Sequence, residues 1–138
     1  HDISMILALA HQQLPNEVFA IGGNYLQANI ADITTANLIF ENGLRAHLFV
    51  SWLHPYKEQK LIVIGEKAMA VFNDAQPWPE KLQIYPHQVN WQNGIPSPEK
   101  AEMQSIPLNE AEPLKLECQY FLEAIEKNLT PRTNGEEG

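Results

Sequence analysis

The chain has 138 residues and a formal net charge of −8, with 44% hydrophobic and 19% charged residues. This balance is ordinary for a globular protein, and the length predicts one domain over residues 1–138. The negative charge disfavours nucleic acid or an anionic membrane surface as a partner, since both need a basic patch. No apolar run approaches the ~18 residues that a membrane-spanning helix requires.

The cysteine content and the first residue indicate the cellular compartment of the protein and how the chain is produced. The one cysteine, Cys118, excludes an internal disulfide and fits a reducing compartment, so we expect a cytoplasmic protein. A chain that begins at His1 without a targeting segment is expected to be processed, or excised from a longer protein.

An amphipathic helix is the first predicted element. Its apolar residues recur at helical spacing over residues 2–14, and Pro15 ends it. From Glu17 to about Ile106 the pattern is typical of successive β-strands. In the first strand, Gly22-Gly23 indicates a bulge or a close approach of two backbones.

Asn42-Gly43 predicts a β-hairpin between residues 33–41 and 44–53, because both turn residues must accept a positive φ. With a two-residue loop, residue 41 faces 44 and residue 39 faces 46. The better core face then carries Ile33, Thr35, Ile39, Leu44, Ala46, Leu48, Val50 and Trp52. The other face, which includes Leu38, Phe40 and Phe49, is mixed, as expected of a surface that meets another subunit or a ligand.

The rest of the chain predicts shorter strands, a loop and a helix. Residues 60–64 and 68–73 form a second hairpin, residues 86–101 are the expected flexible loop, and Pro113 opens the last helix. Cys118 falls on the apolar stripe of that helix, so a buried thiol is expected rather than a nucleophile. The predicted fold class is α+β: a mostly antiparallel sheet with helices packed on one face.

Several short motifs occur in a fixed order along the chain. They are His1-Asp2-Ile3, Ile39-Phe40-Glu41-Asn42-Gly43, Ser51-Trp52-Leu53, Val63-Ile64-Gly65-Glu66-Lys67-Ala68 and Glu112-Pro113-Leu114-Lys115-Leu116-Glu117. In this order and spacing the chain resembles the C-terminal domain of the glucose–fructose oxidoreductase, inositol dehydrogenase and MocA family (Gfo/Idh/MocA). The resemblance covers nearly all of the chain and implies a glyceraldehyde-3-phosphate-dehydrogenase-like substrate-binding domain.

The family resemblance implies an NAD(P)-dependent sugar oxidoreductase whose N-terminal Rossmann domain binds the dinucleotide. Nothing in this chain matches that domain, because Gly22-Gly23 lacks a following helix and the family's Glu-Lys-Pro motif is absent. We therefore expect NAD or NADP to be bound by a domain outside the chain. The chain alone should bind no cofactor and should be inactive.

His1 is the catalytic candidate that the resemblance implies. It matches the histidine of the family's Asp-x-x-x-His pattern, whose aspartate would lie four residues upstream, outside the chain. Its role would be to accept the proton of the sugar hydroxyl or to orient that hydroxyl, a task suited to a base with a pKa near neutral. Residues 51–60 further resemble the branch that acts on nucleotide-linked sugars, such as UDP-N-acetylglucosaminuronate 3-dehydrogenases of surface polysaccharide pathways.

Candidates for the sugar pocket stand where a strand ends. They are Trp52, His54, Tyr56 and Lys57, with Asn24 and Tyr25 after the glycine pair as further candidates. Aromatic rings suit the faces of sugars, and a lysine suits phosphate or carboxylate. The structural alternative is that Trp52 is a core residue and Lys57 a surface charge. The five histidines show no ligand spacing, so no metal site is expected.

Two functions remain open from the sequence. The first is the substrate-binding domain of a sugar oxidoreductase, which forms a homo-oligomer through its sheet face and binds a sugar or nucleotide sugar. The second is a stand-alone β-rich binding or assembly module without redox activity. A gene that extends upstream to encode a glycine-rich strand–turn–helix and a Glu-Lys-Pro motif would favour the first.

Overall fold

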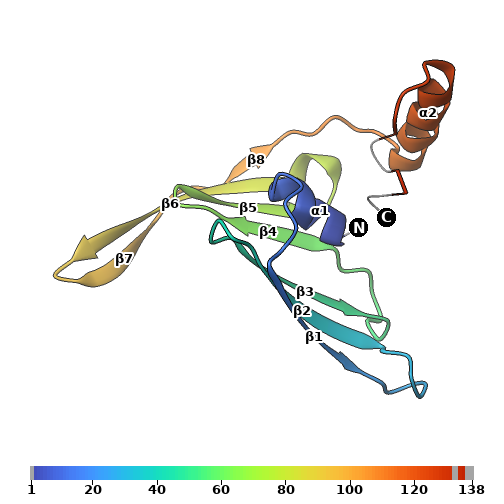
Figure 1. Cartoon of the computed structure of the whole chain (residues 1–138). Coiled ribbons are helices and arrows are strands. Elements are labelled where there is room, and N and C mark those ends of the chain that lie inside the picture. The colour runs from blue at the N-terminus through green and yellow to red at the C-terminus, as the bar shows by residue number, and fades with distance from the viewer. Residues whose placement is uncertain (1, 132–133, 136–138) are drawn as a thin grey trace. The chain divides into compact units, whose positions relative to one another are not determined.

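A computed structural model of the chain describes residues 2–131 and 134–135 (Figure 1). The chain divides into two compact units. One comprises residues 1–63 and 71–75, and the other comprises residues 64–70 and 76–138. The division passes through the hairpin of β4 (Lys60–Ile64) and β5 (Ala68–Asn73).

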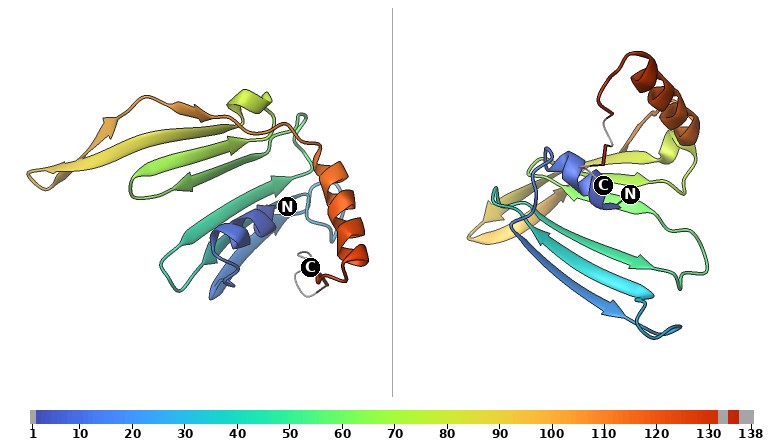
Figure 2. Two further views of the ribbon diagram at one scale, coloured as in Figure 1. Left: turned by 90° about the horizontal axis from the view of Figure 1, so that it is seen from above. Right: turned by 45° about the vertical axis from the view of Figure 1, so that its right-hand side comes forward.

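The first unit is a helix packed on a three-stranded antiparallel sheet (Figures 1 and 2). The elements are α1 (Asp2–Leu9), β1 (Glu17–Gly23), β2 (Ile33–Ile39) and β3 (Arg45–Ser51), and the strand order is β1-β2-β3. Ile6 and Ala10 pack with Leu38 and Phe40 in the core of this unit. Burial of this apolar stripe is what holds α1 on the sheet.

The helix α1 is shorter than the predicted helix over residues 2–14. It ends at Leu9, and His11 and Gln12 then adopt positive φ values of 55° and 61°. The backbone N–H of Gln12 donates to the carbonyl of Leu7 at 2.8 Å, which satisfies a carbonyl at the end of the helix. The helix therefore ends in a left-handed turn well before Pro15.

The hairpin of β2 and β3 closes at Phe40 and Leu44, where the N–H of Phe40 donates to the carbonyl of Leu44 at 3.1 Å. The loop between these two residues has three residues, so the predicted two-residue loop is wrong. Ile39 pairs with Arg45 and Leu38 pairs with Ala46. The N–H of Gly43 donates to the carbonyl of Phe40 at 3.1 Å, and Gly43 has a φ of 90°. This is the longer hairpin loop in which glycine takes the left-handed position.

The extra loop residue changes which side chains share a face, because side chains alternate along a strand. The buried residues of β2 are Ala36 and Leu38, with Phe40 just beyond its end. The predicted core face was therefore wrong for Ile33, Thr35 and Ile39, which lie on the opposite face. For β3 it was correct in placing Ala46 and Leu48 against the core.

The second unit contains a long hairpin. Its elements are η1 (Trp78–Glu80), β6 (Leu82–Gln92), β7 (Ile95–Lys100), β8 (Gln104–Ile106) and α2 (Pro113–Glu126). The second sheet has the order β4-β5-β6-β7, with β8 paired to β6. The predicted loop over residues 86–101 is wrong. It forms the β6–β7 hairpin, closed by Asn93 and Gly94 with φ values of 52° and 78°.

The helix α2 begins as the sequence predicts. Pro113 occupies its first turn, and the carboxylate of Glu112 accepts a hydrogen bond from the N–H of Lys115 at 2.6 Å. Of its described residues only Ala124 is buried. Cys118 is exposed, so the expected buried thiol is wrong. The apolar side chains of the helix are also exposed, namely Leu114, Leu116, Phe121, Leu122 and Ile125.

The α+β class is confirmed, with mostly antiparallel strands and two helices. The strands form two sheets rather than the single sheet that the sequence predicts. In the part of the chain that the structure describes, no helix is long and apolar enough to cross a membrane.

Candidate functional site

A cavity of about 780 Å³ lies in the first unit. It is lined by Asp2 and Ile6 of α1, by residues 47–51 of β3 and by residues 54–61, which connect β3 to the start of β4. Because β3 is the end strand of its sheet, this cavity follows the edge of that sheet. Its volume is within the usual range of small-molecule sites, roughly 300–1,000 Å³.

Three aromatic rings form a row on the wall of the cavity. The ring centroids of Phe49 and His54 are 5.5 Å apart, and those of His54 and Tyr56 are 6.2 Å apart. The planes of the second pair are inclined by 27°, so these rings are roughly stacked. Ring faces of this kind are suited to the C–H-bearing face of a sugar.

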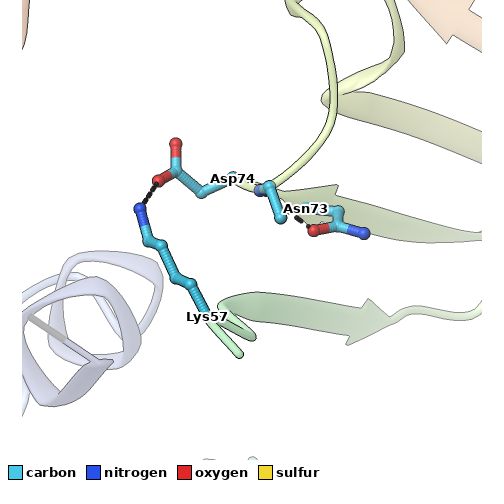
Figure 3. Close-up of polar contacts among 4 residues, drawn as sticks. Lys57, Asn73 and Asp74 are labelled. Carbon is cyan, nitrogen blue, oxygen red and sulfur yellow. Dashed lines mark hydrogen bonds and ion pairs between the residues drawn. The ribbon is translucent and has the colours of Figure 1, made fainter. Parts of the chain in front are cut away.

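Next to these rings, Lys57 is held by an ion pair. Figure 3 shows its side chain pointing toward Asp74, with 2.7 Å between Nζ and Oδ2. The backbone N–H of Asp74 donates to the carbonyl of Gln59 at 3.0 Å, which ties the connection after β3 to the end of β5. The side chain of Asn73 accepts from the N–H of Ala75 at 3.1 Å and fixes the turn that follows (Figure 3).

A weaker contact lies on the same connection. The Nδ1 atom of His54 and the Oε2 atom of Glu58 are 4.0 Å apart. The two side chains form an ion pair when the imidazole is protonated. The cavity wall thus offers aromatic faces, the ammonium groups of Lys57 and Lys60, and the carboxylates of Asp2 and Glu58.

The predicted pocket residues separate into three groups. His54, Tyr56 and Lys57 line the one cavity. Trp52 lies on a smaller hollow of about 330 Å³ with Asp32 and Thr34, and its side chain is 79% exposed, which contradicts a core role.

Asn24 and Tyr25 belong to the loop between β1 and β2. The N–H groups of Tyr25 and Leu26 donate to the carboxylate of Asp32 at 2.6 and 2.7 Å. A Cβ added at Gly23 would lie 2.7 Å from the Tyr25 ring, so the glycine is there for this close approach. These contacts explain the loop conformation, and neither Asn24 nor Tyr25 lines the cavity.

The predicted catalytic residue, His1, lies outside the described residues. Sequence reasoning did not select Phe49, Asp2 or Asp74. Phe49 alternates with core residues of β3, a signal that could have placed it on the open face. Asp74 is 17 residues from Lys57, and no local pattern connects them.

The chain offers no cradle for a dinucleotide among its described residues. Gly22-Gly23 ends β1, and the chain continues through a loop into β2, whereas a dinucleotide pyrophosphate needs a helix N-terminus after the glycine-rich turn. The same residues contain no group of three or more His, Cys, Asp or Glu side chains arranged to hold a metal ion.

Solved structures include chains with a similar fold. UDP-N-acetylglucosamine 3-dehydrogenase GnnA from Acidithiobacillus ferrooxidans, in two crystal forms, superposes with TM-scores of 0.73 and 0.70 at 24% and 22% identity. Each match covers 93% of this chain, which spans only 38% and 36% of those chains. At this level of identity the likeness shows the fold. No curated protein matches the chain.

A family model supplies the identification. The model described as the GFO/IDH/MocA C-terminal domain matches residues 1–71, which contain α1, the β1–β3 sheet and all of the cavity lining described above. This match extends over half of the chain. The chain therefore belongs to the GFO/IDH/MocA family, in the region that the family model describes as the C-terminal domain.

Proposed function

We propose that this chain is the substrate-binding and oligomerising domain of an oxidoreductase that moves a hydride between a hydroxyl carbon of a nucleotide-linked sugar and NAD(P). The observation that carries the proposal is the cavity at the end of β3, with its row of rings and its fixed lysine. Family membership and the likeness to a structure named as a UDP-N-acetylglucosamine 3-dehydrogenase support the choice of substrate class.

In this proposal the residues of the cavity bind and orient the sugar. The rings of His54 and Tyr56 offer a surface for the sugar face, and the ammonium of Lys57 donates hydrogen bonds to a ligand oxygen. His1 accepts the proton of the reacting hydroxyl. Its neighbour Asp2 lines the same cavity, which supports a place for His1 beside the substrate.

The hydride acceptor belongs to another part of the complete protein. The described residues fit no dinucleotide, so NAD or NADP is bound by a further domain, and this chain alone is inactive. We also propose that the complete enzyme acts in the cytoplasm, in keeping with the one cysteine of this chain, the exposed Cys118.

The test is a dehydrogenase assay of the complete protein with UDP-linked amino sugars and either cofactor, followed by the formation of reduced nicotinamide. A His1→Ala variant should lower kcat by roughly 10²–10⁴-fold, because general-base catalysis contributes about that much. Its KM should change far less, because His1 acts mainly in the transition state.

The matched control is His11→Ala, because His11 is an exposed histidine in the turn after α1 and lies outside the cavity lining. That variant should retain its turnover. An unchanged kcat in His1→Ala would remove His1 from the mechanism. A complete protein that reduces neither cofactor with any UDP-linked sugar would instead favour a β-rich assembly module without redox activity.

A further inference from the structure

The ion pair between Lys57 and Asp74 differs from the other exposed ion pairs described because its lysine lines the cavity and its aspartate is largely enclosed. Lys57 lines the cavity, and its side chain is 67% exposed, whereas that of Asp74 is only 30% exposed. The lysine is therefore the accessible partner and the aspartate the more enclosed one. Exposed ion pairs contribute little to stability, so the stability of the domain is a weak reason for this arrangement.

The backbone of Asp74, which carries the carboxylate, is fixed by a hydrogen bond. Its own N–H donates to Gln59, two residues after Lys57, so the same two segments are joined once by the backbone and once by the side chains. The turn after Asp74 is fixed in addition by the side chain of Asn73 (Figure 3). Asp74 can therefore hold the end of a long and otherwise flexible side chain at one place.

We propose that Asp74 is a positioning residue for substrate binding: it holds the ammonium of Lys57 at the cavity wall and offsets its charge. This inference rests on the proposed function. A lysine has three N–H donors, and one is used by Asp74, so two are left for the ligand. Holding the ammonium in place before binding reduces the conformational freedom that the ligand would otherwise have to remove.

The offset charge gives the pair a preference among ligands. A free ammonium attracts any anion, whereas an ammonium beside a carboxylate at 2.7 Å presents little net charge at longer range. Such a pair binds a free anion, such as inorganic pyrophosphate, only weakly. It binds an oxygen of a larger ligand better, because the other contacts of that ligand bring the oxygen to the ammonium. Asp74 thus contributes to selectivity as well as to position.

The test uses the complete protein with the variants Asp74→Asn, Lys57→Met and the double variant. Asp74→Asn should raise KM for the sugar substrate about tenfold, because Lys57 is then no longer held in place before the ligand binds. Its kcat should stay within about twofold, because the reacting atoms are not contacted. Inhibition by inorganic pyrophosphate should become stronger in this variant, because the charge of Lys57 is no longer offset.

The double variant distinguishes positioning from a general structural role. If Asp74 acts through Lys57, Asp74→Asn should cause no further increase in KM when Lys57 is already methionine. A further increase of the same size in the double variant would overturn the proposal, as would an unchanged KM in Asp74→Asn alone. The matched control is Glu123→Gln, which removes the exposed ion pair between Glu123 of α2 and Lys127, just after the helix, and should leave KM unchanged.

A second measurement separates this proposal from the proposed function. Amine labelling of the complete protein, followed residue by residue with mass spectrometry, reports on Lys57 without any substrate. Asp74→Asn should raise the labelling rate of Lys57 severalfold while Lys127 in the same protein stays unchanged. If the protein has no dehydrogenase activity but this change occurs, the proposed function fails and the positioning role remains. An unchanged labelling rate overturns the positioning role itself.

Discussion

Phe40 is the large side chain that the first unit encloses most completely, with 2% of its surface exposed. It lies just after β2 and packs with Ile6, Ala10 and Leu38. Its backbone also forms the hairpin loop, because its N–H donates to the carbonyl of Leu44 and its carbonyl accepts from Gly43. One residue therefore joins the packing of α1 to the geometry of the loop.

Phe40→Ala should lower the free energy of unfolding by about 3–5 kcal/mol, because the truncation removes buried surface and leaves a cavity. Urea denaturation of the complete protein, followed by circular dichroism, would measure the change. The control is Phe19→Ala on β1 of the same sheet, whose side chain is 58% exposed and should matter much less. Equal losses in the two variants would contradict the placement of the core.

At the scale of elements, the β6–β7 hairpin has a protected edge. β7 is the last strand in the order of its sheet, so one of its edges has no partner strand in the described part of the chain. Pro96 and Pro98 pair with Trp91 and Val89 of β6. A proline nitrogen has no hydrogen to donate, so it fits where the nitrogen faces away from the partner strand. The free edge of β7 thus lacks two donors that another strand would need.

Replacing both prolines with threonine should increase association of the protein through this edge, because two N–H donors are restored next to exposed Val89 and Trp91. Sedimentation velocity at increasing concentration would show larger species than in the parent protein. Ser97→Thr is the control, because the N–H of Ser97 lies on the opposite side of the strand from the two proline nitrogens. Identical sedimentation of all three proteins would show that the prolines do not protect the edge.

The same prolines explain what the sequence could and could not predict. Asn93-Gly94 is as strong a turn signal as Asn42-Gly43, yet the prolines beside it favoured a loop over residues 86–101. At Asn42-Gly43 the hairpin was predicted correctly, but its loop length was not, because glycine after asparagine fits both two- and three-residue loops. The length is decided by which strand faces pack against α1, and that is a tertiary effect.

The candidate site was predictable only where it is continuous in sequence. His54, Tyr56 and Lys57 follow one strand end and occupy one cavity wall, so a local pattern was sufficient to select them. Asp74 approaches from a different strand, and Trp52 is directed to another hollow although it is next in sequence to the cavity-lining Ser51. Such placement depends on strand pairing and twist, which residue types alone do not specify.

At the scale of the whole molecule, the first sheet has one covered and one open face. The open face carries the exposed apolar side chains of Phe19 and Ile21 on β1 and Phe49 on β3. Ile21 is 79% exposed although it lies in the middle of a strand. Large apolar side chains exposed on one face of a sheet are typical of protein interfaces, which supports the proposed assembly of copies through the sheet.

Ile21→Lys should weaken this proposed self-association, because a charge in an apolar interface loses its hydration without a partner. Light scattering of the complete protein should show a shift toward smaller species. Ile62→Lys on β4 is the control, because Ile62 is also exposed but is not part of the β1–β3 sheet. An unchanged size distribution in Ile21→Lys would exclude this face as the interface.

The three-residue loop around Gly43 has a consequence for how this sequence can change over time. Exposed loops usually accept insertions and deletions more readily than strands do. Here the loss of one residue would turn the side chains of β3 to the other face relative to β2, exchanging Leu48 for Phe49 beneath α1 and moving the wall of the cavity. Substitutions at the exposed Glu41 and Asn42 should be tolerated during evolution. The number of residues in this loop should be as strongly constrained as the residue types of the core.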